Sequence, residues 1–259
     1  MIDPAVAADE LIRARLEYTV LDRFPGGTVP ANAAEGYAVL DCIIAQFGVP
    51  VGGWKAALTN DAAMQRMKTN APACGPLFQP YIMAAPKTLN LPAAARGLEC
   101  EFAFRMGGNL PSRPEPYSNE EVFAATASLH PAIEVVGPRV KDGAKYGAGT
   151  MIADHCGNAA FVFGEGTAAW HGIDLPAQKV ALSVDGAHAV NGVGSAVLGD
   201  PRISLVWVAN FLRARNRGLK AGDWVTTGST MGVHPVPENC SAVADFGALG
   251  TVAVSFADA

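Results

Sequence analysis

The amino-acid sequence predicts one domain of the α+β class, in which a helical N-terminal part packs on a curled mixed β-sheet. Apolar residues recur at helical spacing over residues 1–70, whereas short strand patterns and turns dominate residues 71–259. The 28 glycines and 18 prolines are spread along the chain and do not gather in a linker. We therefore expect residues 1–70 to form a helical part and residues 71–259 a β-rich part of one structural domain, 1–259.

Three helices are expected in the first 70 residues. Asp3 and Pro4 supply an N-cap and a first-turn proline, and apolar residues then recur at helical spacing. These residues are Leu11, Ile12, Leu16 and Val20. A second helix is expected over residues 31–47, where Gly48 closes it, and a third over residues 60–68.

Strands and turns are expected from residue 98 onward. Residues 98–106 alternate strictly, which is typical of a strand. Ser118 and Glu121 form a capping box, which predicts a helix from Ser118 to about Leu129. The remaining expected elements are a strand at 133–136, a hairpin of 179–184 with 187–190, a helix at 200–213, and strands at 224–227 and 250–256.

The composition excludes several classes of protein. Half of the 259 residues are hydrophobic and 17% are charged, against about 25% charged in an average soluble domain. This excludes intrinsic disorder, and a net charge of −5 offers no broad basic field for nucleic acid or an anionic membrane. No secretory signal or membrane-spanning stretch is visible, and the five cysteines are scattered without a C-x-x-C pair. We expect a soluble cytoplasmic protein whose surplus of apolar residues lies in a large core or between subunits.

Three acidic residues lie inside apolar strand patterns. Glu99 and Glu101 project from one face of their strand, about 6.6 Å apart at Cα, and Glu134 has branched apolar neighbours on both sides. One interpretation is a solvated outer strand face. The other is a site made only of oxygen ligands, because a buried charge is costly unless it is paired or bound to metal. Such a donor set suits Mg²⁺ or Mn²⁺ and not zinc.

Lys55 is the one charged residue in the apolar stretch 51–58. Its side chain either extends to water or meets a buried acid. Asp154 and His155 occupy a turn, where an aspartate is usually structural, and the other histidines form no recognisable triad.

Several short motifs, taken in order, resemble the 2-keto-4-pentenoate hydratase and 4-oxalocrotonate decarboxylase family, whose fold is that of the fumarylacetoacetate hydrolase C-terminal domain. The motifs are GWKAALT at 53–59, LECEF at 98–102, PAIEV at 131–135, IAD at 152–154, LGDP at 198–201, WVAN at 207–210, LKAGD at 219–223 and TGST at 227–230. Together they extend over almost the whole chain, and their order and spacing make the resemblance specific.

The resemblance implies a catalytic β-rich part and assigns roles to its residues. In that family the positions of Glu99, Glu101 and Glu134 bind a divalent metal, here Mg²⁺ or Mn²⁺, and the position of Lys55 is catalytic at the substrate. The substrate would be a small 2-oxo or 2-hydroxydienoic acid, reacting through a metal-stabilised enolate as in the catabolism of aromatic ring-cleavage products. Polar substrate contacts would come from Thr59, Asp154, Asn158 and Thr230. Relatives with this fold assemble into homo-oligomers, so a homo-oligomer is expected.

Two departures from the family pattern leave the reaction open. Ala73 stands where the family commonly has an acid, and Gly137-Pro138 replaces the usual Asp-Ser before Arg139. A hydratase is the first hypothesis. A decarboxylase of a 2-oxo-3-hexenedioate (4-oxalocrotonate) type, with Arg139 holding the second carboxylate, is the alternative, and acylpyruvate C–C hydrolysis is a third. A non-catalytic subunit with the same fold is the hypothesis from a different class.

Overall fold

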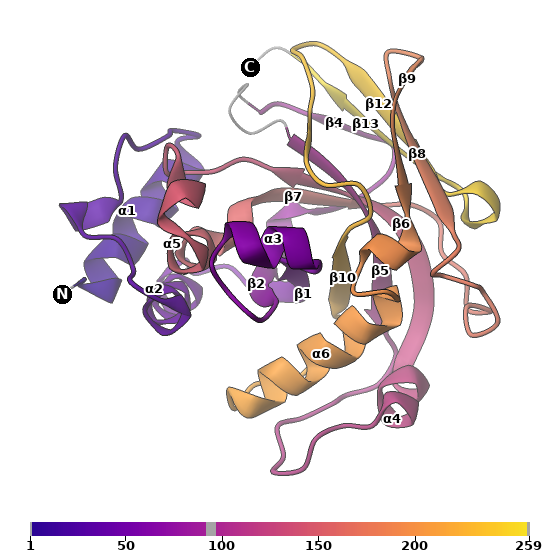
Figure 1. Ribbon diagram of the computed structural model, residues 1–259, viewed down its shortest axis with the longest axis horizontal. Coiled ribbons are helices and arrows are strands. Elements are labelled where there is room, and N and C mark those ends of the chain that lie inside the picture. Colours follow the sequence, from indigo (N-terminus) through magenta and orange to yellow (C-terminus); the bar gives the residue numbers. More distant parts are fainter. Residues whose placement is uncertain (1, 92–96, 258–259) are drawn as a thin grey trace.

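Two mixed β-sheets form the centre of the computed structural model, which describes residues 2–91 and 97–257 (Figure 1). The large sheet has the order β2-β1-β10-β5-β6-β7-β3, with β11 paired to β5, and the second sheet has the order β4-β13-β12-β8-β9. The strands of the large sheet are β1 (Val51–Ala57), β2 (Ala73–Phe78), β3 (Ile82–Ala84), β5 (Gly97–Met106), β6 (Thr126–Val136), β7 (Asn158–Phe163), β10 (Trp224–Ser229) and β11 (His234–Pro235). Those of the second sheet are β4 (Lys87–Leu89), β8 (Lys179–Val184), β9 (Ala187–Val193), β12 (Ser241–Asp245) and β13 (Thr251–Phe256).

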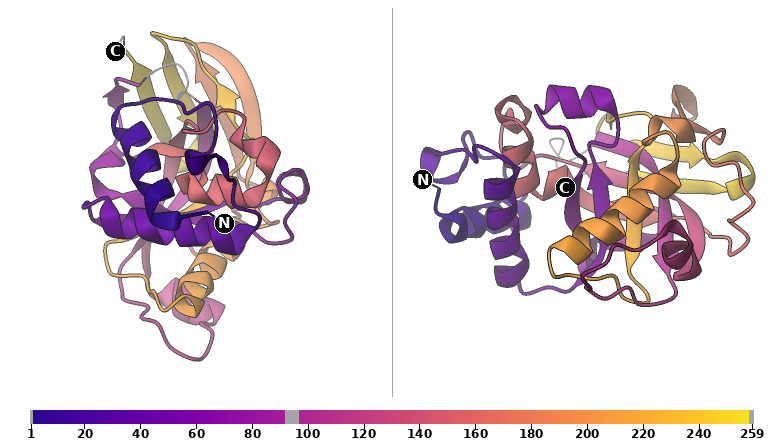
Figure 2. Two further views of the ribbon diagram at one scale, coloured as in Figure 1. Left: turned by 90° about the vertical axis from the view of Figure 1, so that its left-hand side faces the viewer. Right: turned by 60° about the horizontal axis from the view of Figure 1, so that its bottom comes forward.

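The N-terminal helices lie at the end of the molecule away from the second sheet (Figure 2). Helix α1 (Pro4–Leu16) begins at Asp3, whose side chain accepts two backbone N–H bonds, and α2 (Ala33–Gln46) begins at Asn32, whose side chain accepts one. The remaining helices are α3 (Asp61–Arg66), α4 (Asn119–Ala124), α5 (Ala148–Ala153) and α6 (Pro201–Ala214), with 3₁₀ turns η1 (Pro25–Gly27), η2 (Gln79–Tyr81), η4 (Gly143–Tyr146), η5 (His155–Gly157), η6 (Gly194–Ala196) and η7 (Gly247–Leu249). Within the described ranges no helix is both long and apolar enough to cross a bilayer.

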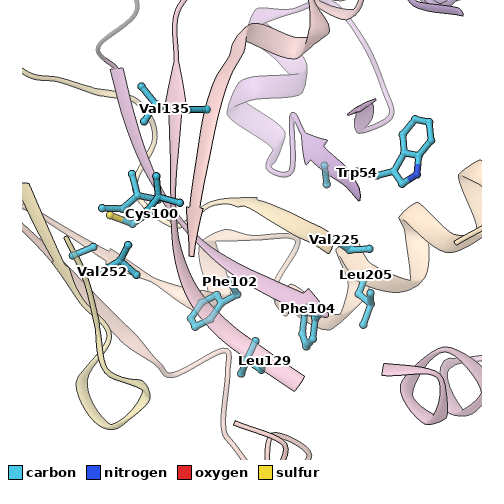
Figure 3. Packing of buried hydrophobic residues seen from close by; sticks show 14 of the residues in the cluster. Trp54, Cys100, Phe102, Phe104, Leu129, Val135, Leu205, Val225 and Val252 are labelled. Carbon is cyan, nitrogen blue, oxygen red and sulfur yellow. The ribbon is translucent and has the colours of Figure 1, made fainter. Parts of the chain in front are cut away.

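The principal core packs against one face of β5 (Figure 3). Cys100, Phe102 and Phe104 project from this face and are fully buried. Phe102 makes an edge-to-face contact with Phe246, and Phe104 makes one with Trp170. Because side chains alternate along a strand, the glutamates of β5 project from the opposite face.

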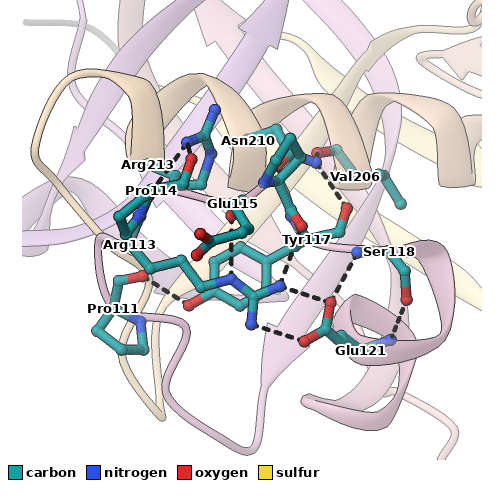
Figure 4. Close-up of polar contacts among 11 residues, drawn as sticks. Pro111, Arg113, Pro114, Glu115, Tyr117, Ser118, Glu121, Val206, Asn210 and Arg213 are labelled. Carbon is teal, nitrogen blue, oxygen red and sulfur yellow. Dashed lines mark hydrogen bonds and ion pairs between the residues drawn. The ribbon is translucent and has the colours of Figure 1, made fainter.

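The connection between β5 and α4 is held by polar contacts (Figure 4). Arg113 forms an ion pair with Glu121 at 2.6 Å, and the Asn210 side chain on α6 accepts the backbone N–H of Tyr117 at 2.8 Å. The Tyr117 hydroxyl donates to the carbonyl of Pro111 at 2.6 Å. These contacts join the connection to both α4 and α6.

The structure confirms the capping box but corrects the helix that follows it. Ser118 and Glu121 cap α4 reciprocally, yet the helix ends at Ala124 and not near Leu129. Strand β6 begins at Thr126 and pairs with β5 through to Val136, so the expected strand at 133–136 is the end of a strand of 11 residues. Pairing along the whole of β5 outweighs the local tendency to extend the helix.

A second correction concerns the expected helical part at residues 1–70. Residues 51–57 form strand β1, which lies inside the large sheet between β2 and β10. The sheet therefore begins well before residue 71, and Lys55 lies on it. The third expected helix is shorter than 60–68, because α3 covers Asp61–Arg66 with Asn60 as its N-cap.

Candidate metal centre and cleft

Three glutamates from two paired strands meet on one face of the large sheet. In the antiparallel pair β5–β6, Glu99 lies opposite Glu134, and Glu101 follows two residues along the same face of β5. One carboxylate oxygen from each glutamate lies within 4.8 Å of the others. Glu101 and Glu134 are fully buried, so this face is in the protein interior and is not a solvated outer face.

Two carboxyl groups of the cluster, those of Glu99 and Glu101, resist ionisation. Burial raises the pKa of Glu99 to about 7, and the charge of Glu134 adds to this shift against the opposing charge of Lys55. Burial and the charges of Glu134 and Glu99 hold the pKa of Glu101 well above its usual range. Carboxylates this close repel one another unless a cation lies between them. A bound cation would relieve this repulsion.

The free oxygens of the cluster fit a hard metal ion. Glu101 Oε2 accepts the backbone N–H of Gly228 at 3.0 Å, and Glu134 Oε1 accepts the side-chain amide of Asn158 at 2.9 Å. These bonds orient each carboxylate. Glu101 Oε1 is buried without a hydrogen bond from any described residue, whereas the buried Glu134 Oε2 faces the Lys55 ammonium group at 3.0 Å. Unpartnered buried oxygens are costly, and oxygen donors of this kind suit Mg²⁺ or Mn²⁺.

Lys55 reaches the cluster from β1. Its Nζ lies 3.0 Å from Glu134 Oε2 and donates to the backbone carbonyl of Cys156 at 3.1 Å. Burial lowers the pKa of Lys55, but the charges of Glu134 and Glu99 outweigh that effect, so the pKa lies above its usual value. A buried ammonium group beside the carboxylates therefore keeps its proton at neutral pH.

A cleft of about 470 Å³ opens beside the cluster and is lined by Lys55, Glu99 and Thr59 among others. This volume is in the range of small-molecule sites. Much of its wall is apolar, including Leu58, Met67, Val136, Met151 and Val233. The structure thus brings together five of the residues predicted from the sequence, namely Lys55, Thr59 and the three glutamates.

Asp154, Asn158 and Thr230, also predicted as substrate contacts, do not line this cleft. Asp154 is buried against Arg139, accepting from its Nε at 2.5 Å and from its backbone N–H at 2.7 Å. The Thr230 hydroxyl donates to the carbonyl of Cys100 at 2.9 Å. Arg139 is likewise absent from the cleft wall, so the structure gives no support to its suggested contact with a second substrate carboxylate.

Asn158 instead connects the cluster to a buried network. Its side chain contacts Glu134, while its backbone carbonyl accepts from Arg139 at 2.6 Å and from Arg15 at 2.5 Å. Arg15 comes from α1 and is only 4% exposed. The sequence interpretation missed Arg15, although a charge on the buried face of an amphipathic helix is a signal that could have identified it.

Apolar packing surrounds the position where the family commonly has an acid. Ala73 on β2 pairs with Ala57 of β1 and is buried in a cluster with Leu58, Met67 and Cys156. The other cleft residues missed from the sequence are Cys156, whose carbonyl binds Lys55, and Arg66 on α3. Neither had a local sequence signal, because each becomes a cleft residue only through long-range packing.

Comparisons with known proteins agree with this fold. The 2-keto-4-pentenoate hydratase of Paraburkholderia xenovorans (strain LB400) is 28% identical over 213 residues, covering 80% of this chain and 76% of that protein. The 4-oxalocrotonate decarboxylase of Pseudomonas sp. (strain CF600) is 26% identical over 210 residues, covering 81% of this chain and 78% of that protein. No protein-family model matches the chain.

Among solved structures, the 4-oxalocrotonate decarboxylase from Pseudomonas putida G7, complexed with magnesium and adipate, superposes with a TM-score of 0.85 at 24% identity. The superposition covers 98% of this chain and 97% of that one. Together the matches confirm the resemblance drawn from the sequence and the α+β fold of the fumarylacetoacetate hydrolase type.

Proposed function

We propose that the chain is a divalent-metal-dependent lyase, because its sequence and its fold are similar to those of the 2-keto-4-pentenoate hydratase and 4-oxalocrotonate decarboxylase family. Its reaction would be the addition of water to a 2-hydroxydienoate or 2-oxo-enoate. The observation that carries this proposal is the buried carboxylate triad with Lys55 at the base of a cleft.

The glutamates, Lys55 and the apolar cleft wall would each have a separate role in this reaction. Glu99, Glu101 and Glu134 would hold Mg²⁺ or Mn²⁺, which when bound supplies a Lewis acid for the carboxylate and 2-oxygen of the substrate. Lys55 holds a proton at Nζ within a buried site, and it is placed to move that proton at the 2-oxygen or the adjacent carbon. The apolar wall confines the conjugated chain and restricts bulk water.

A decarboxylase of a 2-oxo-enedioate is the second candidate, because a 4-oxalocrotonate decarboxylase is similar over nearly the same share of the chain. Both reactions use the same electron sink at the 2-oxygen. They differ in whether water adds or CO₂ leaves.

One assay separates the candidates. The protein, supplied with Mg²⁺ or Mn²⁺, is incubated with 2-hydroxypenta-2,4-dienoate and with 2-oxo-3-hexenedioate, and loss of the dienol and release of CO₂ are measured separately. Dienol loss without CO₂ supports the hydratase, and CO₂ release supports the decarboxylase. Absence of both reactions, together with no metal-dependent rise in the unfolding temperature, would identify a non-catalytic subunit.

We also propose that the chain acts in the cytoplasm as a homo-oligomer. Large hydrophobic side chains exposed near the N-terminus support self-association.

A further inference from the structure

The cleft wall carries one arginine that the proposed chemistry does not use. Three charged side chains line the cleft, namely Lys55, Glu99 and Arg66. Lys55 is paired with Glu134, and Glu99 belongs to the carboxylate cluster. Within residues 2–91 and 97–257, Arg66 makes no hydrogen bond or ion pair. Its guanidinium group is therefore available to a ligand.

Helix α3 places Arg66 in the wall of the cleft. It is the last residue of α3, whose start is fixed by the Asn60 side chain accepting the backbone N–H of Ala63 at 2.9 Å. The side chain is exposed and lines the same cleft as Glu99.

The remaining wall near Arg66 offers little to an anion. Ala63, Met67, Met151 and Val233 are apolar, and the polar Thr59, Asn60 and Ser229 carry no charge. A guanidinium group binds a carboxylate through two parallel hydrogen bonds, which an apolar or neutral end cannot accept.

We infer that Arg66 is a specificity-determining residue that binds a second carboxylate at the far end of the substrate. The preferred substrates would then be unsaturated 2-oxo or 2-hydroxy dicarboxylic acids and not monocarboxylic acids with an apolar end. This inference rests on the proposed function, because it assumes that the 2-oxo acid end binds at the glutamates. In hydration this distal carboxylate takes no part in bond making, whereas in decarboxylation of a 2-oxo-3-hexenedioate it is the group that Arg66 would position before it leaves as CO₂.

Two unreactive acids of equal chain length test the inference. 2-Oxoadipate and 2-oxohexanoate share the 2-oxo acid group and differ only in a distal carboxylate or methyl group. Their binding to the Mn²⁺-loaded protein is measured by calorimetry. We expect wild type to bind 2-oxoadipate about tenfold more tightly, as one charge-assisted pair would give. Arg66→Gln should abolish that preference and Arg66→Lys should retain part of it.

Lys68→Gln is the matched control, because Lys68 is an exposed cation two residues away that does not line the cleft. It should keep the wild-type preference. Equal binding of the two acids to wild type, or a preference that survives in Arg66→Gln, overturns the inference alone. Failure of both acids to bind the Mn²⁺-loaded protein overturns the proposed function and the inference together.

Discussion

We expect the ionised carboxylate of Glu101 to destabilise the metal-free protein and to strengthen metal binding. Its pKa lies well above the usual range because of burial and the nearby charges of Glu134 and Glu99. Ionised Glu101 therefore costs stability when no cation is present. Glu101→Gln should raise the unfolding temperature of the metal-free protein at pH 7, and it should weaken Mn²⁺ binding by at least about tenfold.

Thermal unfolding with increasing MnCl₂ measures both effects of Glu101→Gln. Glu238→Gln, which removes an exposed carboxylate, is the control. In this variant MnCl₂ should raise the unfolding temperature by as much as it does in wild type. A metal-induced rise of the same size in Glu101→Gln would contradict the assignment of this residue as a ligand.

Asn158 orients Glu134, one of the proposed metal ligands, and does not line the cleft. Removing its amide in Asn158→Ala leaves Glu134 Oε1 buried without a donor, which should cost about 1–3 kcal/mol of stability. Metal affinity should also fall about tenfold to a hundredfold, because the carboxylate loses its fixed orientation. Urea unfolding and Mn²⁺ titration by calorimetry measure the two losses. The exposed Asn191→Ala is the control, and an unchanged Mn²⁺ affinity in Asn158→Ala would show that the amide serves stability alone.

At the scale of elements, the turn η5 connects the site to the N-terminal helices. Its Cys156 carbonyl holds Lys55, while His155 lies 3.4 Å from Arg15 and packs edge-on against Phe78. His155 and Cys156 both have positive φ, near 52°. Two consecutive non-glycine residues in the left-handed region are unfavourable unless the surroundings hold them. The conformation of this turn therefore depends on the buried contacts around it.

Those contacts make the stability of the turn sensitive to acid. Burial and the charges of Arg139 and Arg15 hold the pKa of His155 well below its usual value of 6.5. The folded protein keeps His155 neutral, whereas the unfolded chain takes up a proton as the pH falls through about 6.5. The contribution of His155 is therefore fully present above pH 6.5 and is lost progressively below it, by up to about 1.4 kcal/mol per pH unit.

His155→Gln should flatten this dependence. The free energy of unfolding, measured by urea denaturation between pH 8 and pH 5, should fall less steeply in the variant than in wild type. His171→Gln, at an exposed position, should follow the wild-type curve. Parallel curves for His155→Gln and wild type would mean that His155 has the same pKa in the folded and the unfolded protein, which would contradict the lowered pKa.

Elements whose partners are local in sequence could be predicted, and elements decided by distant partners could not. Alternation over residues 98–106 correctly separated the glutamate face of β5 from the Cys100 and Phe102 face. The capping box located the start of α4 for the same reason. The end of α4 depended on pairing between β6 and β5, which no local pattern records.

The same distinction holds for the site. Glu99 and Glu101 lie on one strand, so their proximity follows from strand geometry alone. Arg15 and Asn158 are 143 positions apart, and their contact exists only in the folded chain. The pairing of Asp154 with Arg139, 15 positions apart, likewise turned an expected substrate contact into a buried ion pair.

Across the whole molecule, the site depends on both layers of the fold. Residues of the second sheet and the segments around it pack against Phe102 and its neighbours on one face of β5, and this packing supports the strand that carries glutamates on its other face. The N-terminal helices secure the opposite side through Arg15, which donates to the carbonyls of Asn158 and Ala159. Loss of either layer would therefore displace the three glutamates although neither layer supplies them.

The surface of the N-terminal part supports the last prediction. Four of its large hydrophobic side chains are exposed, at 51% for Val6, 56% for Leu16, 48% for Tyr18 and 39% for Val20. They lie within 15 positions of one another, at the end of the molecule away from the second sheet (Figure 2). Exposed apolar groups gathered in this way are typical of interaction sites. Some of the hydrophobic residues, which make up half of the chain, therefore lie on this surface and not in the core. We expect the protein to self-associate, so that light scattering gives a mass that is a multiple of 26.8 kDa.

Charge placed on that surface should dissociate the assembly. Leu16→Glu buries a carboxylate in the expected interface, which is costly when it has no partner, so the mass should fall toward that of one chain. Val243→Glu places the same charge on the second sheet, at a side chain that is 40% exposed, and should leave the mass unchanged. A wild-type protein that stays monomeric at high micromolar concentration would contradict self-association, and dissociation by Val243→Glu alone would move the interface to the second sheet.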